Sequence, residues 1–448
     1  MLLERIAHLQ HHTCLAPSDA AALASACAHT SPPQIRLAGR LVESITASAP
    51  VTEQPLVGVV VPLAECHAAV WRHAGSSAED GAALGSRSSA AAAARHVAEE
   101  LCMRAQELPA NLPARALRAF ATLPVSATTR RSFLRALLGI PAGAASNDVP
   151  RTVQRLADGE CVQLLQALNN LALPRGDSTV AAAANSTLTQ LVYLRPYAAA
   201  AAAAVGALGD LGLSVVDNDT GARNISMLCS RVRNARNPPP PPSVLLTTLE
   251  GLAGIQRSWQ SSLSSRSSVD MLGSLLPDLH TIPAASLADL TAAIGALDLS
   301  TPARATFLVA LEAALTEAEF QRLPAHSASQ LLHGLAGIYS TSTKYHIECG
   351  RGRDQFRRIP EHDRMSPQPP SVALDVLVQR AAPCIKPHAL DAAELATVCD
   401  ALARLEAPPS VAAPIVYAAV GAAERDISAL RPASTVELVR GLCAFIEV

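Results

Sequence analysis

The feature that most constrains the fold of this chain is a short cassette that recurs at a nearly regular interval. In each copy a small residue precedes a hydrophobic anchor, and a second hydrophobic residue follows the anchor three positions later. The anchors are Phe120, Leu168, Leu208, Leu252, Ile294, Leu335, Leu402 and Leu442. The interval is roughly 40 residues, which is typical of stacked helical repeats. Only the interval from Leu335 to Leu402 is clearly longer than the others.

The best-preserved copy of the cassette is Leu323–Ile338, with the sequence LPAHSASQLLHGLAGI. Its residues Leu331, Leu335 and Ile338 have the spacing i, i+4 and i+7, which places them on one face of a helix. Gly334 lies beside this face and predicts a close approach by another helix. We expect Ser327 or Ser329 to cap the first turn by accepting a backbone hydrogen bond.

Each repeat is predicted to hold two helices. In one repeat the first helix covers 286–299, Ser300 is a candidate cap, Pro302 suits a helix start, and the second helix covers 303–316. A helix pair cannot bury both of its faces alone, whereas stacked neighbours can. Since alanine and leucine also favour helix, the predicted class is all-α: an α-solenoid of about eight or more stacked helix pairs. The apolar segment 55–63 is of undetermined type.

Interruptions of the period divide the chain into four expected parts. The long interval after Leu335 coincides with 343–370, which has the composition of a loop. The parts are 1–104, a helical segment with degenerate repeats and a polar linker near 75–89; 105–342, a repeat array with a proline-rich break near 231–243; 343–370, a basic loop insertion; and 371–448, the C-terminal repeats.

Charge and motifs exclude several function classes. The formal net charge is −2, so a chain that coats nucleic acid along its whole length is excluded and any contact must come from local patches. No apolar stretch is long enough for a membrane span. Phosphate-binding loops, GxSxG, HExxH and paired CxxC motifs are absent from the sequence. We therefore expect no enzyme activity and no cofactor.

Residues of the metal-binding types are few and scattered. His346, Cys349 and His362 form the one metal-like constellation, but they supply at most three ligands where zinc takes four. We therefore predict no metal site. The ten cysteines are dispersed and are predicted to be buried free thiols in a reducing compartment.

Arginine clusters are the candidate contacts to RNA, because guanidinium groups pair with phosphates and stack on bases. The first cluster includes two interleaved aromatics, Tyr345 and Phe356, which can also stack on bases. Its basic members are Lys344, Arg351, Arg353, Arg357, Arg358 and Arg364. The second cluster is Arg231, Arg233 and Arg236, and the third is Arg130 and Arg131 with Arg115, Arg118 and Arg135. A solvated surface loop, or contact with an acidic protein, is the alternative for each cluster.

The cassettes resemble the octotricopeptide and heptatricopeptide repeats and the helical region of FAST-kinase-like proteins, which act in organellar RNA metabolism. The residues that carry the resemblance are 323–338, 282–297 (IPAASLADLTAAIGAL), 390–405 (LDAAELATVCDALARL) and 430–445 (LRPASTVELVRGLCAF). HEAT and armadillo arrays have similar periods. The resemblance implies a protein of the mitochondrial matrix, as in protist (kinetoplastid-type) RNA-editing complexes or mitoribosomes, although Met1–His12 is not a clear presequence.

The expected function is accordingly that of a non-enzymatic scaffold subunit in a mitochondrial RNA-processing or RNA-editing assembly. Its expected partners are protein subunits and mitochondrial mRNA, guide RNA or rRNA. One alternative is a structural subunit or assembly factor of a mitochondrial ribosome, and another is a HEAT-like adaptor that binds proteins.

Overall fold

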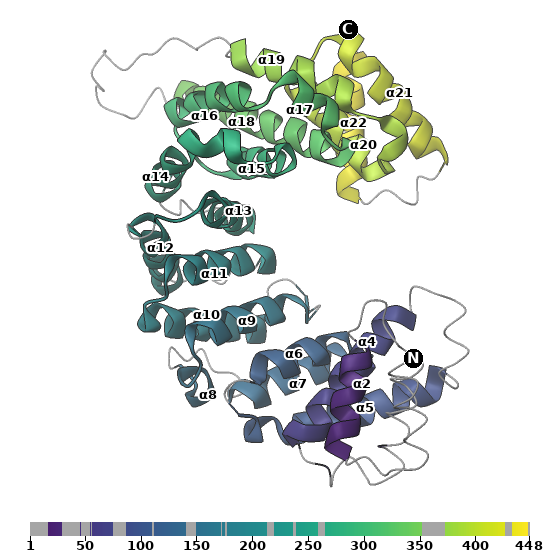
Figure 1. Ribbon diagram of the computed structural model, residues 1–448. Coiled ribbons are helices and arrows are strands. Elements are labelled where there is room, and N and C mark those ends of the chain that lie inside the picture. Colours follow the sequence, from purple (N-terminus) through teal and green to yellow (C-terminus); the bar gives the residue numbers. More distant parts are fainter. Residues whose placement is uncertain are drawn as a thin grey trace. The chain divides into compact units, whose positions relative to one another are not determined.

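The computed structural model is helical throughout its regular structure, which confirms the all-α class (Figure 1). It describes residues 17–28, 45, 54, 56–74, 87–109, 112–139, 149–171, 173–174, 177–212, 219–235, 239–258, 265–351, 372–425 and 432–446. Within these ranges no strand occurs, and no helix is both long and apolar enough to cross a membrane. The chain forms two compact units, which are Met1–Ala200 with Asp210–Met227, and Ala201–Gly209 with Leu228–Val448.

Unit 1 is built from two layers of helices. Its helices are α2 (Pro17–Ala28), the π-helix η2 (Leu56–Val60), α4 (Val61–Ala74), α5 (Arg87–Met103), η4 (Ala105–Glu107), α6 (Pro113–Thr122), α7 (Ala127–Leu138), α8 (Arg151–Gln154), α9 (Asp158–Asn169) and α10 (Ser178–Leu194), with parts of α11 (Ala198–Leu211) and α12 (Asp219–Arg233). In one layer α2 packs on α4, α4 on α6, and α6 on α9; in the other, α5 packs on α7 and α7 on α10.

Unit 2 is also built from two layers. Its helices are α13 (Pro242–Ser258), α14 (Ser265–Leu275), η5 (Leu276–Thr281), α15 (Ala284–Ala296), α16 (Thr301–Ala314), α17 (Glu317–Arg322), α18 (Ala325–Arg351), α19 (Val372–Ala381), η7 (Ala382–Cys384), η8 (Pro387–Ala389), α20 (Ala392–Arg404), α21 (Pro409–Arg425) and α22 (Pro432–Ile446). In one layer α13, α15, α18, α20 and α22 pack in that order, and in the other α14 packs on α16 and α16 on α19.

Each of the eight sequence anchors lies on a helix. The helices are α6 and α9, then α11, and then the unit 2 layer of α13, α15, α18, α20 and α22. Seven of the eight are buried, and Leu442 near the C-terminus is half-buried. We call the helices α2, α4, α6 and α9 of unit 1, and α13, α15, α18, α20 and α22 of unit 2, the anchor layers. The cassette therefore marks the face on which one anchor-layer helix packs against its neighbours.

Glycine brings α15 and α18 into backbone contact, as the sequence predicted for Gly334. A Cβ atom built on Gly334 would lie 2.4 Å from the carbonyl carbon of Thr291, and one built on Gly295 would lie 2.4 Å from the oxygen of Gly334. Gly337 makes a third close contact, since a Cβ atom built on it would lie 2.8 Å from the oxygen of Gly295. We call such a glycine contact between two helix backbones a glycine joint. No side chain can be added at these positions without moving the helices apart.

The same joint occurs between α11 and α13 within unit 2. Gly209 lies against both Gly251 and Gly254: its added Cβ would come within 2.5 Å of the Gly251 oxygen, and a Cβ on Gly254 within 2.7 Å of the Gly209 oxygen. The two pairs of flanking glycines belong to an identical pentapeptide, GLAGI, at 251–255 and 334–338.

Three local expectations need correction or extension. Helix α18 begins at Ala325, and the N–H of Ala328 bonds to the oxygen of Pro324 (2.9 Å). Ser327 and Ser329 are therefore buried inside the helix and do not cap it, because Pro324 sets the start one turn earlier. Within the undetermined segment 55–63, residues 56–60 are π-helix and 61–63 begin α4, while residue 55 lies outside the described residues. Helix α18 continues to Arg351, so the expected loop insertion begins as helix.

Candidate interaction surfaces

Arg130, a candidate RNA contact, is used inside unit 1 to join helices. Its Nη2 donates to the oxygen of Leu123 at the end of α6 (3.3 Å), and its Nη1 donates to the oxygen of Leu171 just beyond α9 (3.0 Å). Carbonyls at the end of a helix have no partner within the helix, so Arg130 satisfies the carbonyl of the α6 C-cap residue and a second one just beyond α9. Burial lowers the pKa of its guanidinium group.

An arginine in unit 2 occupies the corresponding place. Nη2 of Arg304 on α16 donates to the oxygen of Leu297 at the end of α15 (3.1 Å). In both turns the acceptor lies seven residues before the arginine, and a serine, Ser126 or Ser300, stands at the N-cap position of the second helix. The shared sequence pattern is Leu-x-Val/Leu-Ser-x-x-x-Arg, seen as LPVSATTR and LDLSTPAR. This pattern was not recognised from the sequence, although its spacing is visible there.

Arg131, the second candidate of this cluster, forms an ion pair with Asp177 through its Nε (2.5 Å). Asp177 also caps α10 by accepting from the N–H of Thr179 (3.0 Å). Burial acts to raise the pKa of this carboxyl group, but the hydrogen bonds from Arg131 and from Thr179 outweigh it, and the pKa lies below its ordinary value. The pair thus fixes the start of α10 against α7.

One arginine of the second cluster, near the proline-rich break, also forms an ion pair. In unit 2 Arg233 of α12 pairs with Asp270 of α14 (2.9 Å). Arg231 is exposed at the end of α12, and Arg236 lies outside the described residues. The prolines of the break end at Pro242, which is the first residue of α13.

The cluster from Lys344 to Arg364 is only partly described. Lys344 and Arg351 lie in the last turns of α18, where the backbone alone is described. Arg353, Arg357, Arg358 and Arg364 lie outside the described residues, and so does His362. The RNA contact expected of this cluster stays a prediction.

Other arginines of the third cluster line a groove across the anchor layer of unit 1. Arg115 on α6 donates through Nε (2.6 Å) and Nη2 (2.8 Å) to the carboxylate of Glu65 on α4. Arg118 reaches Gln163 on α9 (3.4 Å). The cavity beside them has a volume of about 470 Å³ and is lined by Glu65, Ala68, Arg115, Arg118, Ala119, Thr122 and Asn170. Its two arginines thus link α4, α6 and α9.

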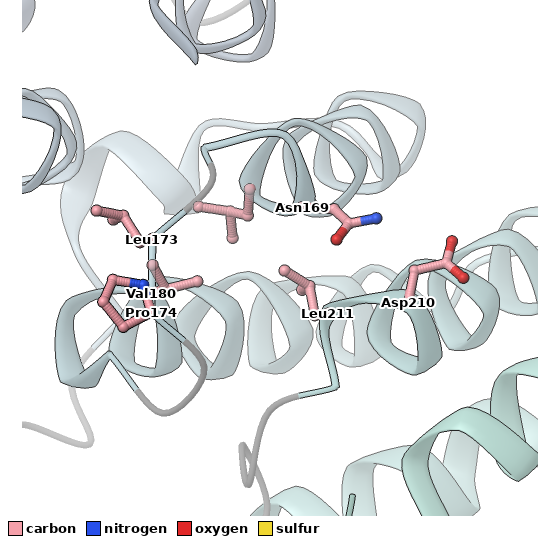
Figure 2. Close-up of a pocket in the computed structure, with 7 residues that line it drawn as sticks. Asn169, Leu173, Pro174, Val180, Asp210 and Leu211 are labelled. Atoms are coloured by element: carbon pink, nitrogen blue, oxygen red, sulfur yellow. The ribbon is translucent and has the colours of Figure 1, made fainter. Parts of the chain in front are cut away.

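A second, smaller cavity of about 190 Å³ lies in unit 1 near the ends of α9 and α11 (Figure 2). Asn169 and Asp210 lie at one end of it, and Leu173, Pro174 and Val180 lie at the other. Burial raises the pKa of Asp210 above its ordinary value. One carboxyl and one amide group can orient a small polar ligand, but this arrangement pairs no nucleophile with a base.

Buried thiols provide no reactive group in the described part of the chain. Burial raises the pKa of Cys161, Cys229 and Cys399 to about 12, and a thiol rather than a thiolate is present at neutral pH. Cys161 and Cys399 are buried as expected, whereas Cys443 is exposed. Among the described residues no group of three side chains is placed to hold a metal ion.

Buried charge instead joins the last helices of unit 2. Asp400 on α20 is 1% exposed and accepts hydrogen bonds from Arg404 on its own helix and from Arg440 on α22 (3.2 Å). His326 on α18 contacts Glu394 on α20 at 2.5 Å. A hydrogen bond between ionisable side chains therefore connects α18 to α20, and an ion pair connects α20 to α22.

No protein-family model matches this chain, and no curated protein matches it.

Proposed function

We propose that this protein is a non-enzymatic helical-repeat scaffold, built as an α-solenoid of stacked helix pairs that follow the period of the cassette. The observation that carries the proposal is the recurring glycine joint. Gly209 is enclosed by Gly251 and Gly254, and Gly295 is enclosed by Gly334 and Gly337. The two joints lie about two cassette intervals apart, and each connects two helices that carry successive anchors. This supports stacked repeats, because each repeat buries its face only against its neighbours.

The use of the ionisable side chains supports a scaffold over a catalyst. Arg130 and Arg304 satisfy the ends of anchor-layer helices, and Asp177 and Asp400 hold arginines between neighbouring helices. Groups with altered pKa values often mark catalytic sites, but structural ion-pair networks alter them too. Here the partners of these groups are helix ends and other helices.

The partners we propose are protein subunits and RNA in a mitochondrial RNA-processing or editing assembly. This part of the proposal is supported by the resemblance of the cassettes at 282–297, 323–338, 390–405 and 430–445 to organellar RNA-metabolism repeats. RNA contact is assigned to the basic cluster from Lys344 to Arg364, whose arginines suit phosphate groups.

The test is purification of the tagged full chain from its native cells, followed by native mass spectrometry of the complex with and without ribonuclease. We expect several protein subunits and an RNA that ribonuclease removes. Recovery of ribosomal subunits would assign the chain to a mitoribosome instead, and a cytosolic complex without RNA would leave an adaptor of the HEAT type. Recovery of the chain alone would contradict a scaffold.

A charge-reversed variant tests the basic cluster. Replacing Arg351, Arg353, Arg357 and Arg358 by glutamate should reduce the RNA recovered with the complex while the protein subunits remain. Unchanged RNA recovery would show that other residues of the complex bind the RNA.

A further inference from the structure

We propose that one edge of unit 1, at the α10–α11 turn with α8 and α12 packed on either side of α10, binds single-stranded nucleic acid. The surface consists of Arg151, Arg155, Tyr193, Arg195, Tyr197 and Arg223, and we call it the tyrosine–arginine edge. It rests on the proposed function for its expected ligand, an RNA strand, and it adds a contact surface distinct from the arginine clusters discussed above.

Two tyrosines dominate this edge. Tyr193 is 80% exposed in the last turn of α10, and Tyr197 is 67% exposed immediately before α11. Leu194 between them is also exposed, whereas Pro196 is buried and holds the turn against the protein. The chain has only five tyrosines. Single exposed apolar side chains are common on protein surfaces, whereas two exposed rings in one turn form a patch of the kind that marks an interaction site.

The backbone of the turn has an uncommon conformation. Arg195 has φ of 55°, in the left-handed region that is unfavourable for side chains other than glycine, asparagine and aspartate. Its N–H bonds to the oxygen of Val192 (3.2 Å). A left-handed residue at a helix end is usually glycine, so a long cationic side chain at this position points to a use for that side chain.

Helix α8 packs beside α10 (Figure 1), and two more arginines lie at its ends. The side-chain amide of Gln190 on α10 donates to the oxygen of Gln154 at the end of α8 (3.0 Å). Arg155 follows Gln154 directly, and Arg151 lies one helical turn before it; both are exposed. Gln190 itself precedes Tyr193 by less than one turn. The two guanidinium groups thus belong to the same edge as the rings.

Helix α12 flanks the edge on the other side of α10. The side chain of Asn224 donates to the hydroxyl of Thr189 (3.2 Å), about one turn before Tyr193. The neighbouring Arg223 is exposed. The edge therefore extends from α8 across the end of α10 to α12.

The positive charge of this edge is not compensated within the described part of the chain. Arg151, Arg155, Arg195 and Arg223 form no ion pair there, in contrast to Arg115, Arg131 and Arg233. Asp158 and Glu160, the described carboxylates that follow Arg155 in the sequence, accept from the backbone N–H groups of Gly159 (2.8 Å) and Ala157 (2.8 Å) and pair with none of these arginines. An anionic partner can supply the missing negative charge.

The combination of rings and guanidinium groups favours nucleic acid over an acidic protein. Unpaired bases stack on aromatic rings while arginines track the phosphates, which is how single strands are held without sequence preference. An acidic peptide would use the arginines but would leave both tyrosine rings without a matching group. In a duplex the faces of the bases are stacked on one another, so a duplex would also leave both tyrosine rings without a matching group.

The test measures the affinity of the purified full chain for a fluorescein-labelled single-stranded RNA of about 15 nucleotides by fluorescence anisotropy. The double variant Tyr193→Ala/Tyr197→Ala should weaken binding by about tenfold or more, because two stacking platforms are removed. Arg151→Glu/Arg155→Glu should also weaken binding. The slope of the logarithm of the binding constant against the logarithm of the salt concentration should become shallower by about 0.7 for each phosphate that the variant no longer neutralises.

Matched controls are available in unit 2. Tyr417 is 78% exposed, and Arg322 is exposed and forms no ion pair within the described residues. Tyr417→Ala and Arg322→Glu should leave the affinity unchanged. A DNA strand of the same sequence distinguishes the source: weaker binding of DNA identifies RNA, and equal binding identifies single strands of either sugar. Circular dichroism confirms that each variant is folded.

Three outcomes would overturn the proposal. One is an intact chain that binds no single strand, and another is a double tyrosine variant that loses no more affinity than the Tyr417→Ala control. The third is a complex that polyglutamate displaces as effectively as unlabelled RNA does, which would identify an acidic protein as the partner. None of these results decides whether the chain is a scaffold, because that question depends on the co-purified subunits.

Discussion

The carboxylate of Asp400 on α20 accepts a hydrogen bond from Arg440 on α22 at 3.2 Å, although Asp400 is only 1% exposed. Arg404 on α20 donates to the other oxygen of the same carboxylate. One buried negative charge therefore holds two arginines from two helices. A buried charge is tolerated when it is paired and hydrogen-bonded, and it is costly when a partner is removed.

We expect Asp400→Asn to destabilise unit 2 more than Arg440→Ala does. The amide cannot balance two guanidinium groups, and the loss of charge-assisted hydrogen bonds should lower the free energy of unfolding by about 2 kcal/mol. Arg440→Ala should cost less than about 1 kcal/mol, because the Arg440 side chain is 59% exposed and Asp400 keeps Arg404 as a partner. Urea unfolding followed by circular dichroism measures both. Equal losses would contradict a buried hub.

Gly334→Ala should separate α15 from α18. Its added methyl group would lie 2.4 Å from the backbone of Thr291, and forcing a group into a packed contact costs about 1–3 kcal/mol. Gly273 in α14 is the matched control, since a Cβ there meets no atom within 4 Å. Gly273→Ala should stabilise the protein by about 0.4–1 kcal/mol. Thermal unfolding of the two variants should shift in opposite directions; a shift in the same direction would contradict the joint.

Arg130→Ala should reduce stability without changing the RNA affinity of the folded protein. The substitution leaves the oxygens of Leu123 and Leu171 without their donor, and we expect a loss of about 2 kcal/mol. Urea unfolding reports the stability and fluorescence anisotropy the affinity. An RNA affinity that falls while the stability is unchanged would restore Arg130 as a direct contact.

Acid should weaken unit 1 through His67 on α4. Burial lowers the pKa of His67 from 6.5 to about 4, so between these values the unfolded chain binds the proton that the folded chain excludes. Stability should therefore be retained above pH 6.5 and fall as the pH drops toward 4. The urea midpoint across this range measures the effect. In His67→Gln the part of the slope due to this group should vanish; a slope identical to that of the parent would exclude His67 as its source.

The all-α class and the buried anchors could be predicted because both depend on local hydrophobic spacing. Anchors such as Phe120 and Ile294 show the helix period directly in the sequence. The close approach at Gly334 was predicted for a similar reason, since a small residue beside an apolar face permits it. The prediction that Ser327 or Ser329 caps this helix was wrong, because the helix already begins at Ala325, directly after Pro324, and both serines lie inside it.

The roles of the arginines could not be predicted from clustering along the chain. Arg131 meets Asp177 only because α7 packs beside α10, and the two residues are distant in sequence. The tyrosine–arginine edge was missed for the same reason: Arg155 and Tyr193 are brought together by the contact between α8 and α10. Only the seven-residue relation of Arg130 to Leu123, repeated at Arg304, was readable from the sequence.

The seven-residue spacing between the acceptor leucine and the arginine constrains the length of the turn between the two helices. Because the guanidinium group of Arg130 or Arg304 must reach a carbonyl seven residues earlier, one inserted residue would rotate the arginine away from the helix end it completes. Insertions between Leu123 and Arg130, or between Leu297 and Arg304, should therefore be tolerated poorly even though parts of both turns are exposed to solvent. Variation in repeat length is expected to accumulate elsewhere, in the connections that lead from one repeat to the next.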